Sequence, residues 1–240
     1  MIASTQTDPT PLIELCGVTK VYGTGQAAMQ ALAGIDLRIA QGDFVAIMGH
    51  SGSGKSTCLN ILGCLDSPTS GSYRFQGVEV SQLTRDQRAK LRRYYLGFVF
   101  QGYNLLKRTS ALENVELPLI YRHVPAGQRH QIARQTLDSV GLKGWESHHP
   151  NELSGGQQQR VAIARAIVTG PSVLMADEPT GNLDSARSQE IMDLLRQLNR
   201  EQGITIVMVT HEPDMAAYAQ RIVRFKDGRI ESDQHNGRAH

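Results

Sequence analysis

The fold of this 240-residue chain is decided by the stretch Gly49-His50-Ser51-Gly52-Ser53-Gly54-Lys55-Ser56-Thr57. It fits the pattern G-x-x-x-x-G-K-[ST], in which glycines let the backbone wrap around a phosphate and direct N–H groups toward it. The apolar run before it, 44–48, predicts a buried strand, and the apolar spacing after it, 59–65, predicts a helix whose positive end favours an anion. We therefore expect a nucleotide-binding loop, with Lys55 at the β- and γ-phosphates and the Ser56 hydroxyl on Mg²⁺.

A second glycine-rich motif, Leu153-Ser154-Gly155-Gly156-Gln157, opens another predicted helix that stops at Gly170-Pro171. Ser154 is a favoured N-cap residue, and the helix start that follows is again suited to an anion. One nucleotide does not need two such helix starts in one subunit. We therefore expect this motif to contact a nucleotide held by a second copy of the chain, although the pentapeptide alone also fits an ordinary N-cap.

Charged side chains follow two further predicted strands. Asp177 and Glu178 come directly after the apolar run 172–176, and His211 follows the run 204–209. Ligands bind at the carboxyl ends of parallel strands, so these side chains should lie beside the same phosphates. We expect Asp177 to hold the Mg²⁺ shell, Glu178 to orient the attacking water and His211 to sense the γ-phosphate.

Two uncharged side chains complete the set. Gln101 follows the run 96–100, and a neutral amide there contacts Mg²⁺ or water and releases it without a charge penalty. Tyr22 is a candidate ring for stacking on adenine, although a half-buried strand tyrosine is nearly as good an interpretation.

In their order along the chain, these motifs resemble the nucleotide-binding domain of ATP-binding cassette (ABC) proteins. The resemblance covers residues 12–228 and rests on Tyr22, GHSGSGKST (49–57), Gln101, LSGGQQQR (153–160), LMADEPTGNLD (174–184) and His211. Within that superfamily, ILGCLDSPTSG (61–71), FVFQGYNLL (98–106) and DEPTGNLD (177–184) are similar to the ATPases of macrolide-efflux and lipoprotein-release transporters. GCLD (63–66) favours the efflux type.

The resemblance implies that ATP and Mg²⁺ are the cofactors, and it assigns three groups of site residues. The catalytic group is Lys55, Gln101, Glu178 and His211. The nucleotide-binding group is Tyr22, Gly49, His50, Ser51, Gly52, Ser53, Gly54, Lys55, Ser56, Thr57, Ser154, Gly155, Gly156, Gln157 and Asp184. The metal group is Ser56, Gln101 and Asp177. Two copies would close head to tail around two MgATP.

The expected fold is α/β: a P-loop NTPase core with a mostly parallel sheet, an N-terminal antiparallel β subdomain and an inserted helical subdomain at about 102–153. One ABC ATPase domain over 11–231 would follow a disordered N-terminus, 1–10, and precede a flexible polar tail, 232–240.

Composition limits the function classes. A net charge of +2 gives no bulk electrostatic case for nucleic acid. Cys16, Cys58 and Cys64 have no metal-like spacing and are interpreted as reduced thiols. There is no apolar run of about 20 residues and no signal-peptide pattern, so we expect membrane work to need a separate partner chain.

The resemblance implies two kinds of partner: a second copy of the chain, and a few-span transmembrane permease with a periplasmic domain. It extends to a periplasmic adaptor and an outer-membrane channel, and it places the chain at the cytoplasmic face of the bacterial inner membrane. A coupling helix of the permease would dock near 104–106.

Two alternatives stay open: the soluble ABC ATPase of iron–sulfur cluster assembly, and a regulator of cell-wall hydrolases acting through a membrane partner. DNA-repair cassettes need a long coiled-coil insertion, for which the segment 101–154 is too short. Translation-factor cassettes carry two phosphate loops, whereas this chain has one.

Overall fold

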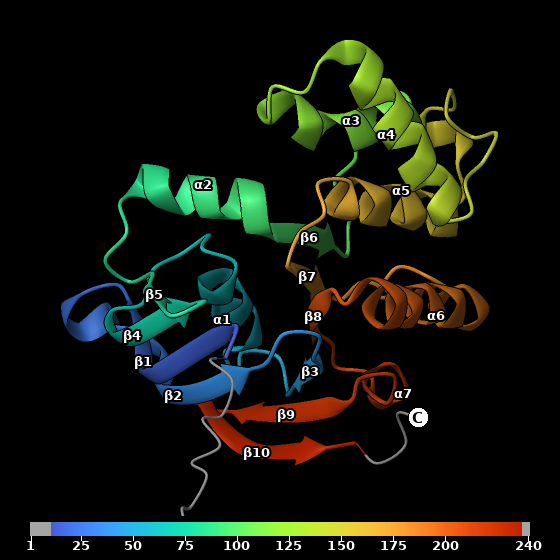
Figure 1. Ribbon diagram of the computed structural model, residues 1–240. Coiled ribbons are helices and arrows are strands. Elements are labelled where there is room, and N and C mark those ends of the chain that lie inside the picture. The colour runs from blue at the N-terminus through green and yellow to red at the C-terminus, as the bar shows by residue number, and fades with distance from the viewer. Residues whose placement is uncertain (1–10, 237–240) are drawn as a thin grey trace, which may run out of the picture.

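The computed structural model describes residues 11–236, so the predicted disordered segment 1–10 lies outside the described residues. The larger of two sheets has the strand order β10-β9-β3-β8-β7-β6, and all its strands are parallel except β10 (Figure 1). Its strands are β3 (Phe44–Met48), β6 (Leu96–Phe100), β7 (Val173–Asp177), β8 (Thr205–Val209), β9 (Arg221–Lys226) and β10 (Arg229–His235). The predicted α/β core with a mostly parallel sheet is confirmed.

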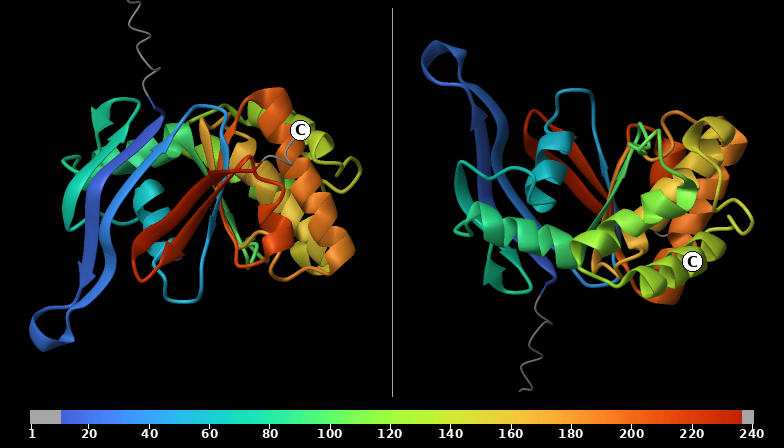
Figure 2. Two further views of the ribbon diagram at one scale, coloured as in Figure 1. Left: turned by 90° about the horizontal axis from the view of Figure 1, so that it is seen from below. Right: turned by 90° about the horizontal axis from the view of Figure 1, so that it is seen from above.

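The smaller sheet is antiparallel, with the order β2-β1-β4-β5. Its strands are β1 (Ile13–Tyr22), β2 (Met29–Ile39), β4 (Ser70–Phe75) and β5 (Val78–Glu79). The hairpin of β1 and β2, with a 3-10 turn at Gly25–Ala27, projects beyond the body of the molecule (Figure 2). The predicted N-terminal antiparallel β subdomain is therefore present.

Helices cover both faces of the parallel sheet. They are α1 (Lys55–Leu62), α2 (Arg85–Tyr95), α3 (Ala111–Tyr121), α4 (Ala126–Ser139), α5 (Gly155–Ile167), α6 (Ser185–Gln202) and α7 (Pro213–Ala216), with a 3-10 turn at Pro150–Glu152. Within residues 11–236, none of the helices is both long and apolar enough to cross a lipid bilayer.

Alternate residues of β3 enter two different cores. Val45 and Ile47 pack into the core that α1 shares with the antiparallel sheet. Phe44, Ala46 and Met48 pack into the core shared with α3 to α7. Both faces of this strand are buried, so its sequence is a continuous apolar run rather than an alternating one. The chain just past its carboxyl end therefore starts from a rigid, fully buried strand.

Helices α3 and α4 form a lobe beside the sheet, in the region predicted to be an inserted helical subdomain (Figure 1). Apolar residues of both helices pack into one core with α5, for example Val115, Leu137 and Val161. The same core contains residues of β3, β7 and α6, so the helix that begins at the second glycine-rich motif connects the lobe with the parallel sheet. The boundary at 102–153 stays a prediction.

The predicted flexible tail is wrong for residues 232–235, which continue strand β10 to His235. The Arg221 guanidinium binds both carboxylate oxygens of Asp233, at 2.6 and 2.5 Å. The Asn236 side chain then donates to the carbonyls of Ala217 and Ala219, at 2.9 and 3.0 Å. The segment is polar because it is an exposed edge strand, and such strands commonly carry charge. The rest of the predicted tail, 237–240, lies outside the described residues.

The three thiols should differ in reactivity. Cys16 is exposed, whereas Cys58 and Cys64 are buried. Burial raises the pKa of Cys58 to about 12 and that of Cys64 to about 11, which removes the reactive thiolate near neutral pH. We expect a maleimide at pH 7.5 to label one thiol per native chain and three in denaturant, counted by mass spectrometry. Rapid labelling of a second thiol in the native chain would contradict this burial, and Cys16→Ser is the control that should abolish native labelling.

Candidate functional site

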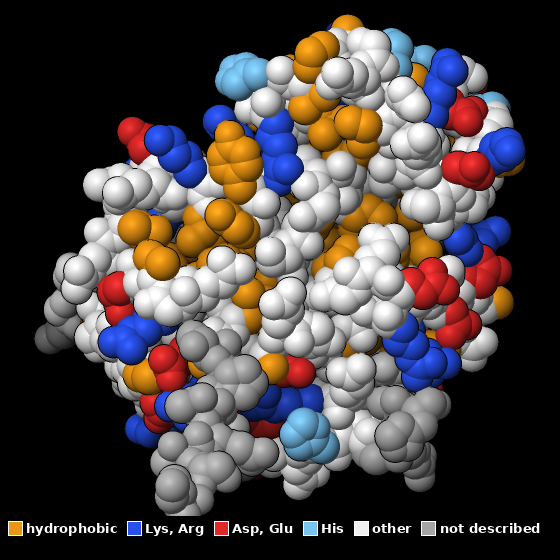
Figure 3. Space-filling model, in the orientation of Figure 1, with side chains coloured by type: hydrophobic (Ala, Val, Ile, Leu, Met, Phe, Trp, Pro, Cys, Tyr) orange, Lys and Arg blue, Asp and Glu red, His pale blue; other side chains and the backbone are white. Residues whose placement is uncertain are grey.

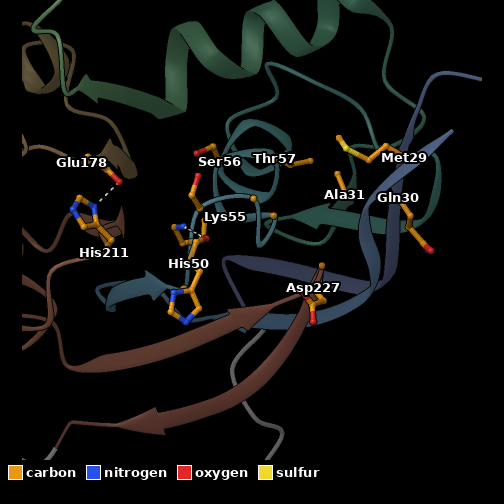
Figure 4. A pocket seen from close by; sticks show the side chains of 15 residues that line it. Met29, Gln30, Ala31, His50, Lys55, Ser56, Thr57, Glu178, His211 and Asp227 are labelled. Carbon is orange, nitrogen blue, oxygen red and sulfur yellow. Dashed lines mark hydrogen bonds and ion pairs between the residues drawn. The ribbon is translucent and has the colours of Figure 1, made fainter. Parts of the chain in front are cut away.

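Part of the sequence-predicted set meets around one cavity of about 890 Å³ at the carboxyl ends of the parallel strands (Figure 4). Its lining consists of Met29, Gln30, Ala31, Gly49, His50, Ser51, Gly52, Gly54, Lys55, Ser56, Thr57, Glu178, His211, Asp227 and Gly228. The loop 49–57, Glu178 and His211 thus come together from three distant parts of the chain. Ser53 is the exception within the loop, because it is buried and does not line the cavity.

Two glycines are required by the close approach of other backbone. At Gly49, a Cβ atom would lie 2.3 Å from the carbonyl oxygen of Phe225 in β9. At Gly54, where φ is +102°, a Cβ would lie 2.6 Å from the carbonyl oxygen of Ala31 in β2. Only a residue without a side chain fits either position. The loop is therefore held at both ends by neighbouring strands, with its backbone turned around the cavity.

Lys55 reaches back over its own loop. Its Nζ donates to the carbonyl oxygen of His50 at 2.8 Å, and the residue is 8% exposed. Burial lowers the pKa of Lys55, while the nearby carboxylates of Glu178 and Asp177 oppose that shift. The ammonium group is thus inside the loop and beside two acids. A phosphate oxygen could replace the His50 carbonyl as its acceptor without moving the helix.

Asp177 ends strand β7 and is partly buried. Burial raises the pKa of its carboxyl, the neighbouring Glu178 raises it further, and Lys55 opposes both. Two crowded carboxylates of this kind favour a nearby cation, and Ser56 adds a hydroxyl oxygen from the loop. Among residues 11–236, no group of three His, Cys, Asp or Glu could hold a metal. The donors fit Mg²⁺, which binds through one or two carboxylates and completes its shell with phosphate and water.

Glu178 and His211 are joined directly. The Nδ1 atom of His211 lies 2.9 Å from Oε1 of Glu178, across the ends of β7 and β8 (Figure 4). Glu178 has φ +46°, unusual for a residue with a side chain, and its N–H donates to the carbonyl of Val209 at 2.9 Å. This arrangement holds the Glu178 carboxylate at the cavity wall, where it can orient a water molecule.

Gln101 and Tyr22 do not line the cavity. The Gln101 side chain is exposed and faces Asn182: its Nε2 donates to Oδ1 of Asn182 at 3.4 Å, and Nδ2 of Asn182 donates to the Gln101 carbonyl at 2.9 Å. Tyr22 donates its hydroxyl to Asp66 at 2.8 Å and leaves 37% of its surface exposed. Their contacts with metal and adenine stay predictions.

The second glycine-rich motif also lies outside the cavity of its own chain. Ser154 caps α5: its Oγ accepts from the N–H of Gln157 at 3.3 Å, and the Gln157 side chain accepts from the N–H of Ser154 at 2.9 Å. Asp184 similarly caps α6, accepting from the N–H of Arg187 at 3.0 Å. Both motifs are therefore helix N-caps. Their contact with a nucleotide held by another copy stays a prediction.

Sequence reasoning missed part of the lining. Residues 29–31 begin strand β2, and Asp227 and Gly228 form the β9–β10 turn. The N–H of Ala33 donates to the carbonyl of Gly228 at 2.8 Å, which brings the two segments together beside the loop. The turn itself is signalled by its Asp-Gly pair, but this long-range pairing has no local signal.

Comparisons with known proteins show which family this chain resembles. A family model described as "ABC transporter" matches residues 32–181. The chain is 54% identical over 224 residues to the macrolide export ATP-binding/permease protein of Azoarcus sp. (strain BH72), covering 93% of this chain and 34% of that protein. It is 52% identical over 231 residues to the pyoverdine export ATP-binding/permease protein of Pseudomonas aeruginosa, covering 96% and 35%. The chain thus spans about a third of the length of these curated relatives.

This chain matches solved structures over most of the length of both chains. A dimeric ATP-binding cassette in a post-hydrolysis state, bound to ADP and phosphate, is 46% identical with a TM-score of 0.86 and covers 93% of this chain and 98% of that chain. A protein from Clostridium perfringens, part of an ABC transporter complex, is 30% identical with a TM-score of 0.86, covering 95% and 90%. Both span the antiparallel sheet, the core and the helical lobe.

Removing the Lys55 ammonium should weaken nucleotide binding. We expect Lys55→Ala to lower the affinity for a fluorescent ATP analogue by roughly tenfold or more, because a charge-assisted contact to phosphate is lost. Lys143→Ala, at an exposed loop position, is the matched control and should bind normally. Equal affinity of both variants would show that Lys55 does not contact the nucleotide.

Proposed function

This chain belongs to the ABC transporter family, and we propose that it is the ATP-hydrolysing unit of a bacterial exporter. The observation that carries the proposal is the meeting of the loop 49–57 with Glu178 and His211 at one edge of the parallel sheet, beside Asp177 and Lys55. ATPase activity is further supported by the similar cassette that binds ADP and phosphate.

Each residue then has a physical task. The loop amides and Lys55 bind the phosphates, and the Glu178 carboxylate orients the attacking water, with His211 near the γ-phosphate. Ser56 and Asp177 would hold Mg²⁺, with Gln101 joining them when its side chain turns from Asn182. When bound, Mg²⁺ would neutralise part of the negative charge on the phosphates. Catalysis is therefore mostly positioning and electrostatic stabilisation.

The site is completed by a second copy. The proposed arrangement pairs the loop 49–57 of one copy with Ser154 to Gln157 of the other, in a head-to-tail dimer around two MgATP. It is supported by the position of the 154–157 motif outside its own cavity and by the dimeric state of the similar cassettes. Asp184, at the start of α6, would lie at the interface between the two sites.

Loss of the Glu178 carboxylate should separate binding from turnover. We expect Glu178→Gln to bind ATP normally, to lower kcat by roughly a hundredfold or more, and to accumulate an ATP-bound dimer in light scattering. Glu201→Gln, an exposed change at the far end of α6, is the matched control and should behave like the parent. A Glu178→Gln protein that still turns over at about half the parental rate would remove Glu178 from this role.

Export is supported by the names of the relatives, which describe macrolide and pyoverdine export. We propose a transmembrane permease as the partner, and the cytoplasmic face of the bacterial inner membrane as the location. A few-span permease with a periplasmic domain would reach a periplasmic adaptor and an outer-membrane channel. The macrolide-export names favour the efflux type over lipoprotein release.

A groove of about 570 Å³ is the proposed permease contact. It lies between α2, β6, α3 and α5, and Leu65, Phe98, Phe100, Leu117 and Tyr121 supply its apolar surface. In Figure 3, apolar side chains gather over the region of α2 and toward α3. An apolar groove of this shape suits a short amphipathic helix.

The position of the groove suits coupling to the nucleotide. Asn104, three residues past Gln101, is part of its lining. Docking of a permease helix would therefore press on the segment that carries Gln101. Of the predicted contact region 104–106, Asn104 is the residue that lines this groove.

A charged side chain in the groove should prevent the permease helix from binding and leave the ATPase activity unchanged. Tyr121 is 58% exposed and lines the groove, whereas its neighbour Ile120 is 44% exposed and does not. We expect Tyr121→Glu to lose the membrane partner, because the apolar face of the docked helix cannot solvate a carboxylate. Ile120→Glu is the matched control and should keep it. Retention of the partner by both variants would exclude the groove as the contact.

The partner itself can be identified by purifying tagged Glu178→Gln from gently solubilised native membranes with MgATP, followed by mass spectrometry. A few-span membrane protein with a large periplasmic domain is the expected result, and its identity separates export from control of cell-wall hydrolases. Recovery of soluble partners only, with the chain absent from the membrane fraction, would overturn the exporter proposal in favour of iron–sulfur cluster assembly.

A further inference from the structure

The Glu178 carboxylate stands on a turn that is bound at both ends to the edge of the parallel sheet, through Val209 at one end and, at the other, through Asn182, which donates to the carbonyl of Gln101 at 2.9 Å. The N–H of Glu178 donates to Val209 in β8, and the N–H of Gly181 donates back to the carbonyl of Glu178 at 3.1 Å. Glu178 itself is in the left-handed region, with φ +46°. Such a conformation persists only where surrounding contacts enforce it, so the residues that follow need a further restraint.

That restraint comes from α5. Gln159 is fully buried, and its Nε2 donates to the carbonyl oxygen of Pro179 at 2.6 Å. Pro179 directly follows Glu178 and has no N–H of its own, so its carbonyl is its one backbone hydrogen-bonding group. Within residues 11–236, the bond from Gln159 is the only hydrogen bond that this carbonyl accepts.

The Gln159 amide is not explained by packing. Its Oε1 is buried and has no hydrogen-bond partner among the described residues. An unpaired buried oxygen is unfavourable, so an apolar side chain of similar size would suit the core at least as well. What the amide adds is the N–H bond to Pro179.

The same helix also supports the segment after Gln101. The Arg165 guanidinium donates to the carbonyl oxygens of Tyr103 and Asn104, at 2.9 and 2.7 Å. Both of these residues have positive φ, 59° and 50°. Helix α5 is capped by Ser154, contacts the Glu178 turn through Gln159 and holds the segment after Gln101 through Arg165. One helix thus connects the 154–157 motif with the turn that carries Glu178 and with the segment after Gln101.

We infer that Gln159 is a positioning residue that fixes the Glu178–Pro179 turn against α5. When Ser154 docks on a nucleotide held by the partner copy, α5 moves as a unit and Gln159 carries the turn with it. Glu178 then reaches its working position in its own site as the dimer closes. The inference rests on the proposed function, because it assigns Gln159 to the ATPase reaction.

The test is Gln159→Met, which keeps the length and volume of the side chain and removes the N–H donor. Asn199→Leu is the matched control: its buried amide on α6 donates to the carbonyls of Gly42 and Ile204, at the opposite end of the sheet. Each protein is assayed for kcat, KM, ATP-analogue affinity, ATP-driven dimerisation and thermal unfolding. Gln159→Leu is a second variant, should Gln159→Met fold poorly.

We expect Gln159→Met to lower kcat by roughly tenfold to a hundredfold, with KM, dimerisation and unfolding temperature close to the parent, because a small misplacement of a catalytic group has effects of this size. Asn199→Leu should lower the unfolding temperature and keep kcat. A folded Gln159→Met or Gln159→Leu protein with parental kcat, or one whose kcat falls only as far as Asn199→Leu does, would overturn the inference. If the proposed function itself were wrong, the result would differ: the parent protein would show no ATPase activity, or Glu178→Gln would retain the parental ATPase activity.

Discussion

The site depends on the close approach of two strands, β9 and β2, to one loop. At Gly49 and Gly54 the carbonyls of Phe225 and Ala31 occupy the space where a side chain would begin. These contacts hold the loop between β9 and β2, and so bind the antiparallel sheet to the parallel core. Lys55 and Ser56 are placed by the same constraint, because α1 starts where the loop ends. Substitution at either glycine would move backbone rather than a flexible side chain.

Much of this arrangement is readable from the sequence because it is local. Buried parallel strands are continuous apolar runs, and the polar residue after each run lies at the ligand edge of the sheet, as Glu178 and His211 do. The helix start at Ser154 is equally local, since capping depends on residues three positions apart.

What the sequence could not supply depends on long-range contacts. Residues 29–31 lie beside the cavity, where a backbone bond joins Ala33 to Gly228. The polar segment 232–235 is a strand that pairs with β9, and Arg221 of β9 binds its Asp233. Gln159 lies within the recognisable stretch 153–160, yet its bond to Pro179 spans 20 residues and has no periodic signature. Side-chain orientation is also invisible in sequence, as Gln101 illustrates by facing Asn182 rather than the cavity.

The central claim is that each nucleotide lies between the loop 49–57 of one chain and the Ser154 helix of another. It is tested most directly by cross-linking two preparations in a Cys16→Ser, Glu178→Gln background, one carrying Ser51→Cys and the other Ser154→Cys. A short bismaleimide should join the two different chains in MgATP and leave them separate without nucleotide. Absence of the mixed product in MgATP, or equal yield without it, would contradict the shared site.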